Sequence, residues 1–367
     1  MARYTDAVLA MARRHWLVLL SAALAVAFVM AGRVPAGSAL RAVDVDLLLV
    51  LFALLTTIEI LRASGYLELA VASTLSLFPR TRPFGLALII LSGALASLVT
   101  NDVALFVLVP FTIIAGRFSE FDVEDAVILE IIAANLVGCL TPLGNPQNLF
   151  VFHRSAWSAG HFIGVMAPFA AWNLAGLLAV MFLFRRSRPM AAAGIELPQR
   201  SPAAGIAGAV CFAAVVLEIA RVTLAWEAAV CALIAGTLFL RRRILSIDYS
   251  IVPLFFFTFI IVEGLRSMHV YRAGANLYAA SIALSQVVSN VPATVLLSPM
   301  AAGRWRELLY GVDAAGCGTI IASLANLLGW RIYVRESGRD PHFFRRLMLL
   351  NFVFLAWAAA GGWLLLR

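Results

Sequence analysis

Two segments of this chain carry the same unusual pattern of small and polar residues within apolar surroundings. Residues 135–149 read NLVGCLTPLGNPQNL, and residues 313–327 read DAAGCGTIIASLANL. A second matching pair precedes them, LVTNDVALFVLVP at 98–110 and VVSNVPATVLLSP at 287–299. Aligned without a gap, the first two segments share Gly138/Gly316, Cys139/Cys317, Thr141/Thr319, Asn148/Asn326 and Leu149/Leu327. The repetition predicts an internally duplicated architecture.

The composition predicts that this duplication lies in a membrane. Of the 367 residues, 62% are hydrophobic and 13% are charged, whereas soluble domains are roughly half apolar and about a quarter charged. Six apolar segments approach or exceed the roughly 20 residues that a helix needs to cross the bilayer. They are 16–31, 47–61, 162–184, 203–220, 223–240 and 343–366. We therefore expect an all-α polytopic membrane protein with about 10–11 spans and no sizeable soluble domain.

The positive charge of the chain is read as a topology signal. Its formal net charge of +8 does not indicate nucleic-acid binding, because the arginines gather at the ends of apolar segments. By the positive-inside rule the N-terminus, with Arg13 and Arg14, is cytoplasmic, as are the segments 185–202 and 241–243. This predicts a multi-pass protein of the plasma (inner) membrane whose C-terminus lies outside. The four cysteines show no metal-ligand spacing, so we expect buried free thiols.

The polar segment 185–202 also divides the chain. We predict an N-terminal repeat half over 1–184, a cytoplasmic linker over 185–202 and a C-terminal repeat half over 203–367. In each half two apolar runs flank a polar tip and precede an interrupted helix, which we interpret as a re-entrant hairpin followed by a broken helix. The predicted boundaries are 84–110 and 274–299 for the hairpins, and 124–152 and 308–334 for the broken helices.

The two halves are predicted to be inverted. The segments 58–65 (IEILRASG) and 262–269 (VEGLRSMH) match because each has a glutamate followed three residues later by an arginine. The arginine-based topology gives them opposite directions across the membrane. This places the pseudo-two-fold axis in the membrane plane.

The helix breaks are the first candidate binding elements. Residues 141–148 (TPLGNPQN) hold two prolines and one glycine, which a continuous helix accepts only at a cost. Broken backbone at membrane depth occurs where it is buried in protein or lines an aqueous cavity. Its freed N–H groups attract anions and its carbonyls can bind a cation; a packing hinge is the alternative. The candidate ligands are Thr141, Gly144, Asn145 and Asn148, with Gln147 beside them, and Thr319, Ser323 and Asn326 in the second copy.

The hairpin tips are the second candidate element. Thr100–Asn101 and Ser289–Asn290 each place a hydroxyl beside a carboxamide. Their O–H and N–H donors can bind a carboxylate or an oxyanion. Their oxygens can instead ligate sodium, which makes Asn101 and Asn290 candidate sodium ligands.

Two acidic residues are candidates for ion coupling. Asp102 follows the first tip, where the second tip has Val291. An ionisable residue at membrane depth is costly, so Asp102 is a candidate for carrying a proton, binding a cation or anchoring a hydroxylated solute. A structural carboxylate is the alternative. Asp313, which aligns with Asn135, is the second coupling candidate, and its alternative is a position near the entrance of the span.

At these motifs the chain resembles the ion transporter superfamily, which includes divalent-anion/sodium symporters, arsenite permeases and NhaD-type sodium/proton antiporters. In the symporters, two Ser-Asn-Thr tips face two broken helices. Both tips here depart from Ser-Asn-Thr at the third residue, and the first also at its first. The Asn101–Asp102 pair is closer to the arsenite-permease branch, and the lost Ser-Asn-Thr pattern argues against sodium-coupled dicarboxylate transport.

The resemblance implies an elevator mechanism, in which hairpins and broken helices move as a transport domain past a scaffold. It also implies that solute and coupling ions bind between tips and breaks, and that the protein is a homodimer. We therefore predict a secondary active transporter for a small anion or oxyanion, coupled to protons through Asp102 or to sodium.

Two alternatives within transport stay open. One is a sodium/proton-type antiporter that uses Asp102 and Asp313. The other is the membrane subunit of an arsenite-efflux pump that works with a soluble ATPase. A membrane enzyme is not expected, because no nucleophile elbow, Walker A or metal-protease motif is present. No cofactor, resident metal or nucleic-acid partner is expected either.

Overall fold

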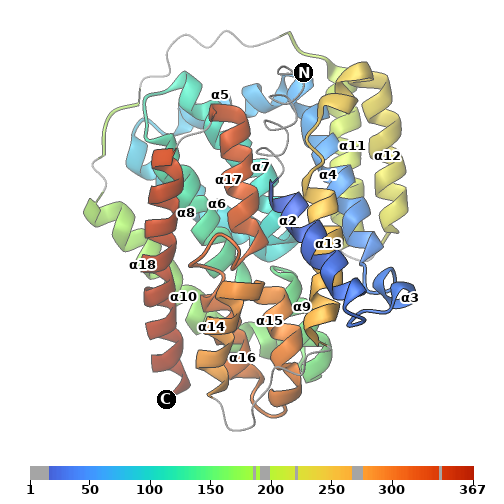
Figure 1. Cartoon of the computed structure of the whole chain (residues 1–367). Coiled ribbons are helices and arrows are strands. Elements are labelled where there is room, and N and C mark those ends of the chain that lie inside the picture. Colours follow the sequence, from blue (N-terminus) through green and yellow to red (C-terminus); the bar gives the residue numbers. More distant parts are fainter. Residues whose placement is uncertain (1–15, 185–186, 191–198, 220–221, 267–275, 339–340) are drawn as a thin grey trace, which may run out of the picture. The chain divides into compact units, whose positions relative to one another are not determined.

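The structure is a computed structural model of the whole chain (Figure 1). It describes residues 16–184, 187–190, 199–219, 222–266, 276–338 and 341–367. Over these ranges the chain is all-helical, apart from an isolated bridge between Arg80 and Pro189. The N-terminal arginines, residues 185–186 and 191–198 of the predicted linker, and residues 267–275 lie outside the described ranges.

The apolar segments form helices. The six segments predicted from composition correspond to α2 (Trp16–Met30), α4 (Val45–Ala63), α10 (Ala159–Phe184), α11 (Pro202–Ile219), α12 (Ala225–Phe239) and α18 (Pro341–Leu366). Among the described residues, four helices are long and apolar enough to cross a membrane, namely α6 (Thr81–Val99), α7 (Asn101–Phe118), α10 and α18. This agrees with the polytopic all-α membrane protein expected from composition.

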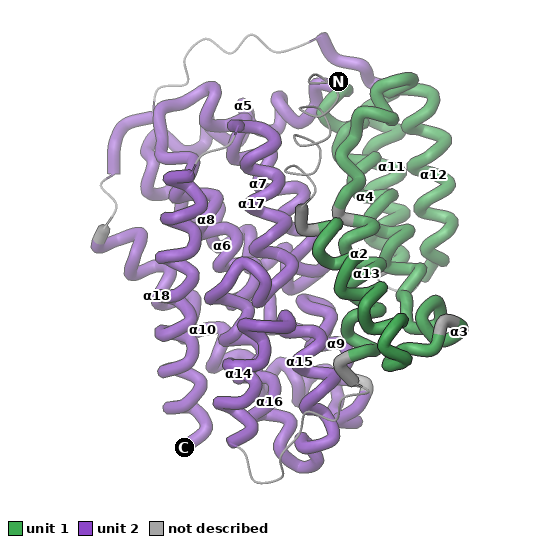
Figure 2. The backbone as a smooth tube through the Cα atoms, viewed as in Figure 1, with its two compact units in different colours: residues 1–63, 203–271 green, residues 64–202, 272–367 purple. Residues whose placement is uncertain are grey.

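The chain folds into two compact units, and each unit takes segments from both sides of the linker (Figure 2). Unit 1 comprises residues 1–63 and 203–271, and unit 2 comprises residues 64–202 and 272–367. The first crossing from unit 1 to unit 2 is followed by Gly65, whose φ of 74° is in the left-handed region that favours glycine.

Unit 1 is a bundle of closely packed helices. It contains α2, α3 (Ala36–Ala39), α4, α11, α12, the 3-10 helix η2 (Arg241–Ser246) and α13 (Ile251–Arg266). α4 packs against α12, and α2 packs against α13. A Cβ atom at Gly236 of α12 would lie 2.7 Å from Thr56 Cγ2, and one at Gly264 of α13 would lie 2.4 Å from Phe28 Cδ1. Small residues thus permit close helix contact, as is common in membrane bundles.

Unit 2 contains both hairpins and both interrupted helices. The first half contributes α5 (Tyr66–Leu77), α6, α7, α8 (Val123–Leu136), η1 (Gly138–Leu140), α9 (Pro146–Ser155) and α10. The second contributes α14 (Leu277–Val288), α15 (Asn290–Leu297), η3 (Ser298–Met300), α16 (Trp305–Ala314), α17 (Leu324–Ser337) and α18. The hairpins turn at Thr100 and Ser289. Helical structure is interrupted between α8 and α9 and between α16 and α17.

The first hairpin is longer than the predicted 84–110, because α6 begins at Thr81 and α7 ends at Phe118. α6 and α7 have 19 and 18 residues, so each arm reaches the length of a membrane span. Pro110 was expected to end the second arm but lies inside α7. Packing of α7 against α5, α6, α8 and α17 offsets the backbone hydrogen bond that this proline removes. In the second hairpin, by contrast, α15 ends at Leu297, before Pro299.

The described part of the linker is tied to the start of the first hairpin. The N–H of Thr81 donates to the Arg188 carbonyl at 3.0 Å, and the N–H of Arg188 donates to Thr81 Oγ1 at 3.0 Å. The N–H of Met190 donates to the Pro79 carbonyl at 2.8 Å. Residues 187–190 therefore act as a strap on the N-terminal end of α6.

Candidate functional site

Each hairpin tip is joined to the helix break of its own half by a main-chain hydrogen bond. The N–H of Asn101 donates to the Gly144 carbonyl at 2.9 Å, and the N–H of Asn290 donates to the Ala322 carbonyl at 2.9 Å. Gly144 and Ala322 occupy equivalent positions in the repeat. A Cβ atom at Gly144 would lie 1.8 Å from the Gly138 carbonyl oxygen, so the first break requires glycine there.

The two tips also share a strained backbone conformation. Thr100 has a φ of 124° and Ser289 a φ of 75°, both in a region that residues with a side chain rarely adopt. Such a conformation costs on the order of 1–3 kcal/mol and is commonly found at functional sites. The side-chain oxygens of Asn101 and Asn290 each accept the next N–H in the chain at 2.9 Å. The tips are therefore built alike despite their different sequences.

The two predicted threonines anchor the breaks to the hairpins. The Thr141 hydroxyl donates to the Ser97 carbonyl, and the Thr319 hydroxyl donates to the Gln286 carbonyl at 2.8 Å. The N–H of Thr319 also donates to Gln286 Oε1 at 2.8 Å. Because both hydroxyl protons go to main-chain carbonyls, these threonines hold the breaks in place and offer a solute only their oxygen lone pairs.

Asn135 on α8 connects the first tip to the second break. Its Oδ1 accepts Asn101 Nδ2 at 3.1 Å and Ser323 Oγ at 2.9 Å. Its Nδ2 donates to Asn326 Oδ1 at 2.9 Å. All four side chains are buried. The sequence had placed Asn135 only as the counterpart of Asp313, so its central role in this network was missed.

Asp313 on α16 makes the reciprocal connection to the first break. Its Oδ1 accepts Gln147 Nε2 at 2.9 Å and lies 3.5 Å from Asn145 Nδ2. Asn145 aligns with Ser323, and Asp313 aligns with Asn135. The contact between Asp313 and Asn145 therefore corresponds to the contact between Asn135 and Ser323. In both directions the helix before one break supports the break of the other half.

Unpaired oxygen atoms gather around the first break. Within the described residues, Asp102 Oδ1, Asn145 Oδ1, Asn148 Oδ1 and Asp313 Oδ2 are buried without a hydrogen-bond partner. Asp102 is 7% exposed and Asp313 only 1%. Leaving a buried acceptor unpaired costs about 1–3 kcal/mol. A bound proton or cation would relieve that cost.

Two further buried asparagines belong to the duplication. Asn173 on α10 and Asn351 on α18 are both 0% exposed, and their helices pack together (Figure 1). Their Nδ2 atoms donate to the carbonyls of Phe169 and Leu347, at 2.9 and 3.0 Å, and both Oδ1 atoms are unpaired. They are separated by the same offset as Asn135 and Asp313. Extending the alignment to the end of each half would have identified them.

Cysteine and acidic side chains give no sign of a metal centre in the part of the chain that the structure describes. No three His, Cys, Asp or Glu side chains gather there in a way that could hold a metal ion. All four cysteines are free, and Cys139, Cys211 and Cys317 are buried. Cys231 is partly buried, and its Sγ lies 3.3 Å from Cys211 Sγ in unit 1.

Comparison with known proteins identifies relatives along most of the chain. A family model described as citrate transporter matches residues 7–328. An uncharacterized transporter of Methanocaldococcus jannaschii is 33% identical over 292 residues, which cover 77% of this chain and 79% of that protein. The inner membrane protein YbiR of Escherichia coli is 30% identical over 337 residues, which cover 89% of this chain and 88% of that protein.

Proposed function

This chain belongs to the citrate transporter family, and we propose that it works as a secondary active transporter for a small anion or oxyanion, coupled to protons. Membership makes it a multi-pass membrane transport protein, and the Methanocaldococcus jannaschii relative is described as a transporter. The observation that carries the proposal is the set of matched contacts between tips and breaks, next to unpaired buried carboxyl oxygens.

The second tip is the proposed contact for the anion. The Asn101 side-chain nitrogen already donates to Asn135, whereas the Asn290 side-chain nitrogen has no hydrogen bond within the described ranges. Asn290 thus keeps a donor for a carboxylate or oxyanion oxygen. It also begins α15, so the positive end of that helix dipole adds to the attraction. Ser289 and Thr100 complete the proposed tip ligands.

The first break is the proposed coupling site. An anion needs donors, but the unpaired groups here are acceptors, which suit a proton or a cation. We assign the coupling proton to Asp102 and treat Asp313 as the second carboxyl that takes part. Sodium bound near Asn101 would use the same oxygens.

An elevator mechanism is proposed for the movement. Both tips and both breaks belong to unit 2, whereas unit 1 contains none of them. This division supports the assignment of unit 2 as the transport domain and unit 1 as the scaffold. The paired contacts of the two halves support an inverted repeat, and we propose a homodimer in the membrane.

A sodium/proton-type antiporter is the second candidate function. It is favoured by one observation, that Asn145 and Asn148 at the first break, Asp313 beside them and Asp102 at the first tip each keep a buried oxygen without a hydrogen-bond partner in the described structure. In this alternative Asp102 and Asp313 exchange a cation for protons, and no anion moves.

Proteoliposomes test the proposal. Purified protein is reconstituted, and uptake of radiolabelled citrate, succinate and arsenite is measured with an inward proton gradient, an inward sodium gradient or neither. We expect one of these anions to accumulate with the proton gradient and to be released by a protonophore. Sodium efflux coupled to protons, with no anion uptake, would support the antiporter instead. Uptake that requires ATP and a soluble partner would indicate a pump subunit.

A further inference from the structure

A buried carboxyl group on α8 lies outside the contacts that join the tips and breaks. Glu130 is 0% exposed, and its Oε1 accepts the Thr112 hydroxyl of α7. Its Oε2 has no partner among the described residues. The main-chain carbonyl of Glu130 accepts the Ser92 hydroxyl of α6 at 2.8 Å, which holds this level of α8 between α6 and α7. The Glu130 side chain has no role in the site proposed above, so its burial needs a separate explanation.

We propose that Glu130 relays protons between one end of unit 2 and the tip-and-break cluster. The inference rests on the proton coupling proposed above and extends it by naming a path. Asp125, Glu130 and Asn135 follow each other on α8 at intervals of five residues. Because a helix rises 1.5 Å per residue, each interval spans roughly 7.5 Å along the axis. Along the helix axis Glu130 thus lies midway between Asp125 and Asn135, and each interval also turns the side chain by about 140° around α8.

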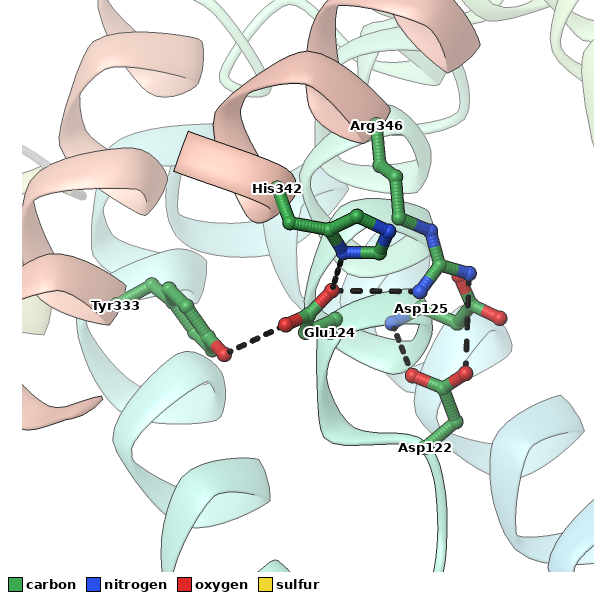
Figure 3. Close-up of polar contacts among 6 residues, drawn as sticks. All are labelled: Asp122, Glu124, Asp125, Tyr333, His342 and Arg346. Carbon is green, nitrogen blue, oxygen red and sulfur yellow. Dashed lines mark hydrogen bonds and ion pairs between the residues drawn. The ribbon is translucent and has the colours of Figure 1, made fainter. Parts of the chain in front are cut away.

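The outer end of this path is a charged network that water can reach (Figure 3). The Arg346 guanidinium on α18 contacts Asp125 and Glu124, and His342 Nδ1 lies 3.1 Å from Glu124 Oε2. The His342 side chain is 53% exposed. The network therefore joins buried Asp125 to the exposed side chain of His342.

A cavity reaches α8 one helical turn before Glu130. It has a volume of about 730 Å³, and its lining includes Asp122, Asp125 and Ala126. Ala126 precedes Glu130 by four residues, so the two lie on the same face of α8, one turn apart. Helical side chains lean toward the N-terminus of their helix, which is the direction of the cavity. Glu130 itself does not line the cavity, and its carboxyl group extends from the next turn of α8.

The surroundings of Glu130 favour its neutral form in this conformation. A buried carboxylate is stable only when paired and well hydrogen-bonded, and Glu130 has one hydroxyl partner and no ion pair in the described structure. The titratable groups on helices that pack against α8 make no described contact with Glu130. They are Arg82, Asp102, Arg117, His161, Arg306, Glu307, Tyr310, Asp313, Arg331, Tyr333, Arg335, Glu336, His342, Arg345 and Arg346, with Cys139 on η1. Glu130 therefore has no charged partner among the described residues that would stabilise its ionised form.

The test compares Glu130→Gln with a matched change from acid to amide, Asp46→Asn, at an exposed position of unit 1. The measured quantity is the ratio of citrate, succinate or arsenite uptake with an inward proton gradient to uptake without it. We expect Glu130→Gln to reduce this ratio about tenfold, equivalent to one pH unit of driving force, and Asp46→Asn to leave it unchanged. A wild-type ratio in Glu130→Gln would overturn the relay alone. A wild-type protein that ignores the proton gradient would overturn the proposed coupling, and the relay with it.

A second readout separates a relay from a purely structural carboxyl group. Infrared difference spectra recorded between low and high pH should contain a protonated-carboxyl band that is absent in Glu130→Gln. Thr112→Val removes the hydroxyl partner and should shift the pH midpoint of that band and of uptake together. A Glu130 band that never changes with pH, or a Thr112→Val variant with the wild-type midpoint in both measurements, would contradict the relay.

Discussion

The two helix breaks of unit 2 share the hydrogen bonds that attach them to the hairpins, and they differ in the side-chain atoms that they leave unpaired. In both, a tip N–H donates to a break carbonyl at 2.9 Å, and a threonine hydroxyl holds the break against the hairpin. In the second break, Ser323 and Asn326 are bonded to Asn135. In the first, Asn145 and Asn148 have unpaired oxygens. Duplication has thus kept the main-chain contacts, while the two breaks differ in the hydrogen bonding of their side-chain oxygens.

The sequences of the breaks explain part of this difference. Pro142, Gly144 and Pro146 in the first break align with Ile320, Ala322 and Leu324 in the second. Two prolines remove two N–H donors from the first break. The oxygens of the second break, however, accept Asn135 Nδ2 and the Ala325 N–H. Asp313 aligns with Asn135 but has no side-chain N–H to donate, so Asn148 Oδ1, the counterpart of Asn326 Oδ1, stays unpaired.

The largest expected effect comes from truncating either tip. Asn101→Ala removes the side-chain link to Asn135, and Asn290→Ala removes the proposed donor to the anion. Each should lower uptake by proteoliposomes on the order of 100-fold, equivalent to about 3 kcal/mol for a hydrogen bond to a charged group. Size-exclusion profiles and thermal unfolding check that both variants remain folded. Normal uptake in either variant would remove that tip from the site.

Exchanging the equivalent residues Gly144 and Ala322 tests whether the two breaks have the same space for a side chain. Gly144→Ala forces a methyl group against the Gly138 carbonyl, so we expect a loss of about 3 kcal/mol of stability. Ala322→Gly removes a methyl group that fits, and should cost only about 0.5–1 kcal/mol. Thermal unfolding of the purified proteins in detergent measures both. Equal losses would mean that the two breaks tolerate side chains alike.

The acidic residue of the first tip is expected to affect coupling more than folding. With an inward proton gradient, wild-type uptake should rise as the external pH falls, because more carriers are loaded with a proton. Asp102→Asn cannot lose or gain that proton, so the pH dependence should flatten and the stimulation by the gradient should fall about tenfold. Val291→Asn serves as the control at the second tip. An unchanged pH profile in Asp102→Asn would exclude Asp102 as the proton carrier.

The smallest effect is expected where the two halves are most alike. Asn173→Leu and Asn351→Leu each remove a buried oxygen without a partner, so each should change stability by only about 1 kcal/mol, in the stabilising direction. Because their contacts match, the two variants should shift the unfolding temperature equally. A clear difference between the two unfolding temperatures would show that α10 and α18, like the two breaks, have become different after duplication.

Sequence reasoning identified the elements that depend on local chemistry. Apolar length indicated the helices, and the prolines and glycine of 141–148 indicated the first interruption. The hydrogen bonds between side chains of the two halves could not be predicted from the sequence. The contact of Asn135 with Ser323 joins residues 188 positions apart and depends on how the halves pack. Pro110 was misjudged for the same reason, because packing from four neighbouring helices decides whether α7 continues.

The main-chain bonds between tips and breaks have a consequence for how such proteins diversify. A link between Asn101 N–H and the Gly144 carbonyl does not depend on which side chain occupies the tip. The third tip residue can therefore be an acid in one copy and valine in the other without loosening the joint. Under the proposed function, the transported solute can change through substitution of a few tip side chains while this main-chain hydrogen bond is kept. Exchanging whole tip triplets between members of the family is accordingly a practical route to new selectivity.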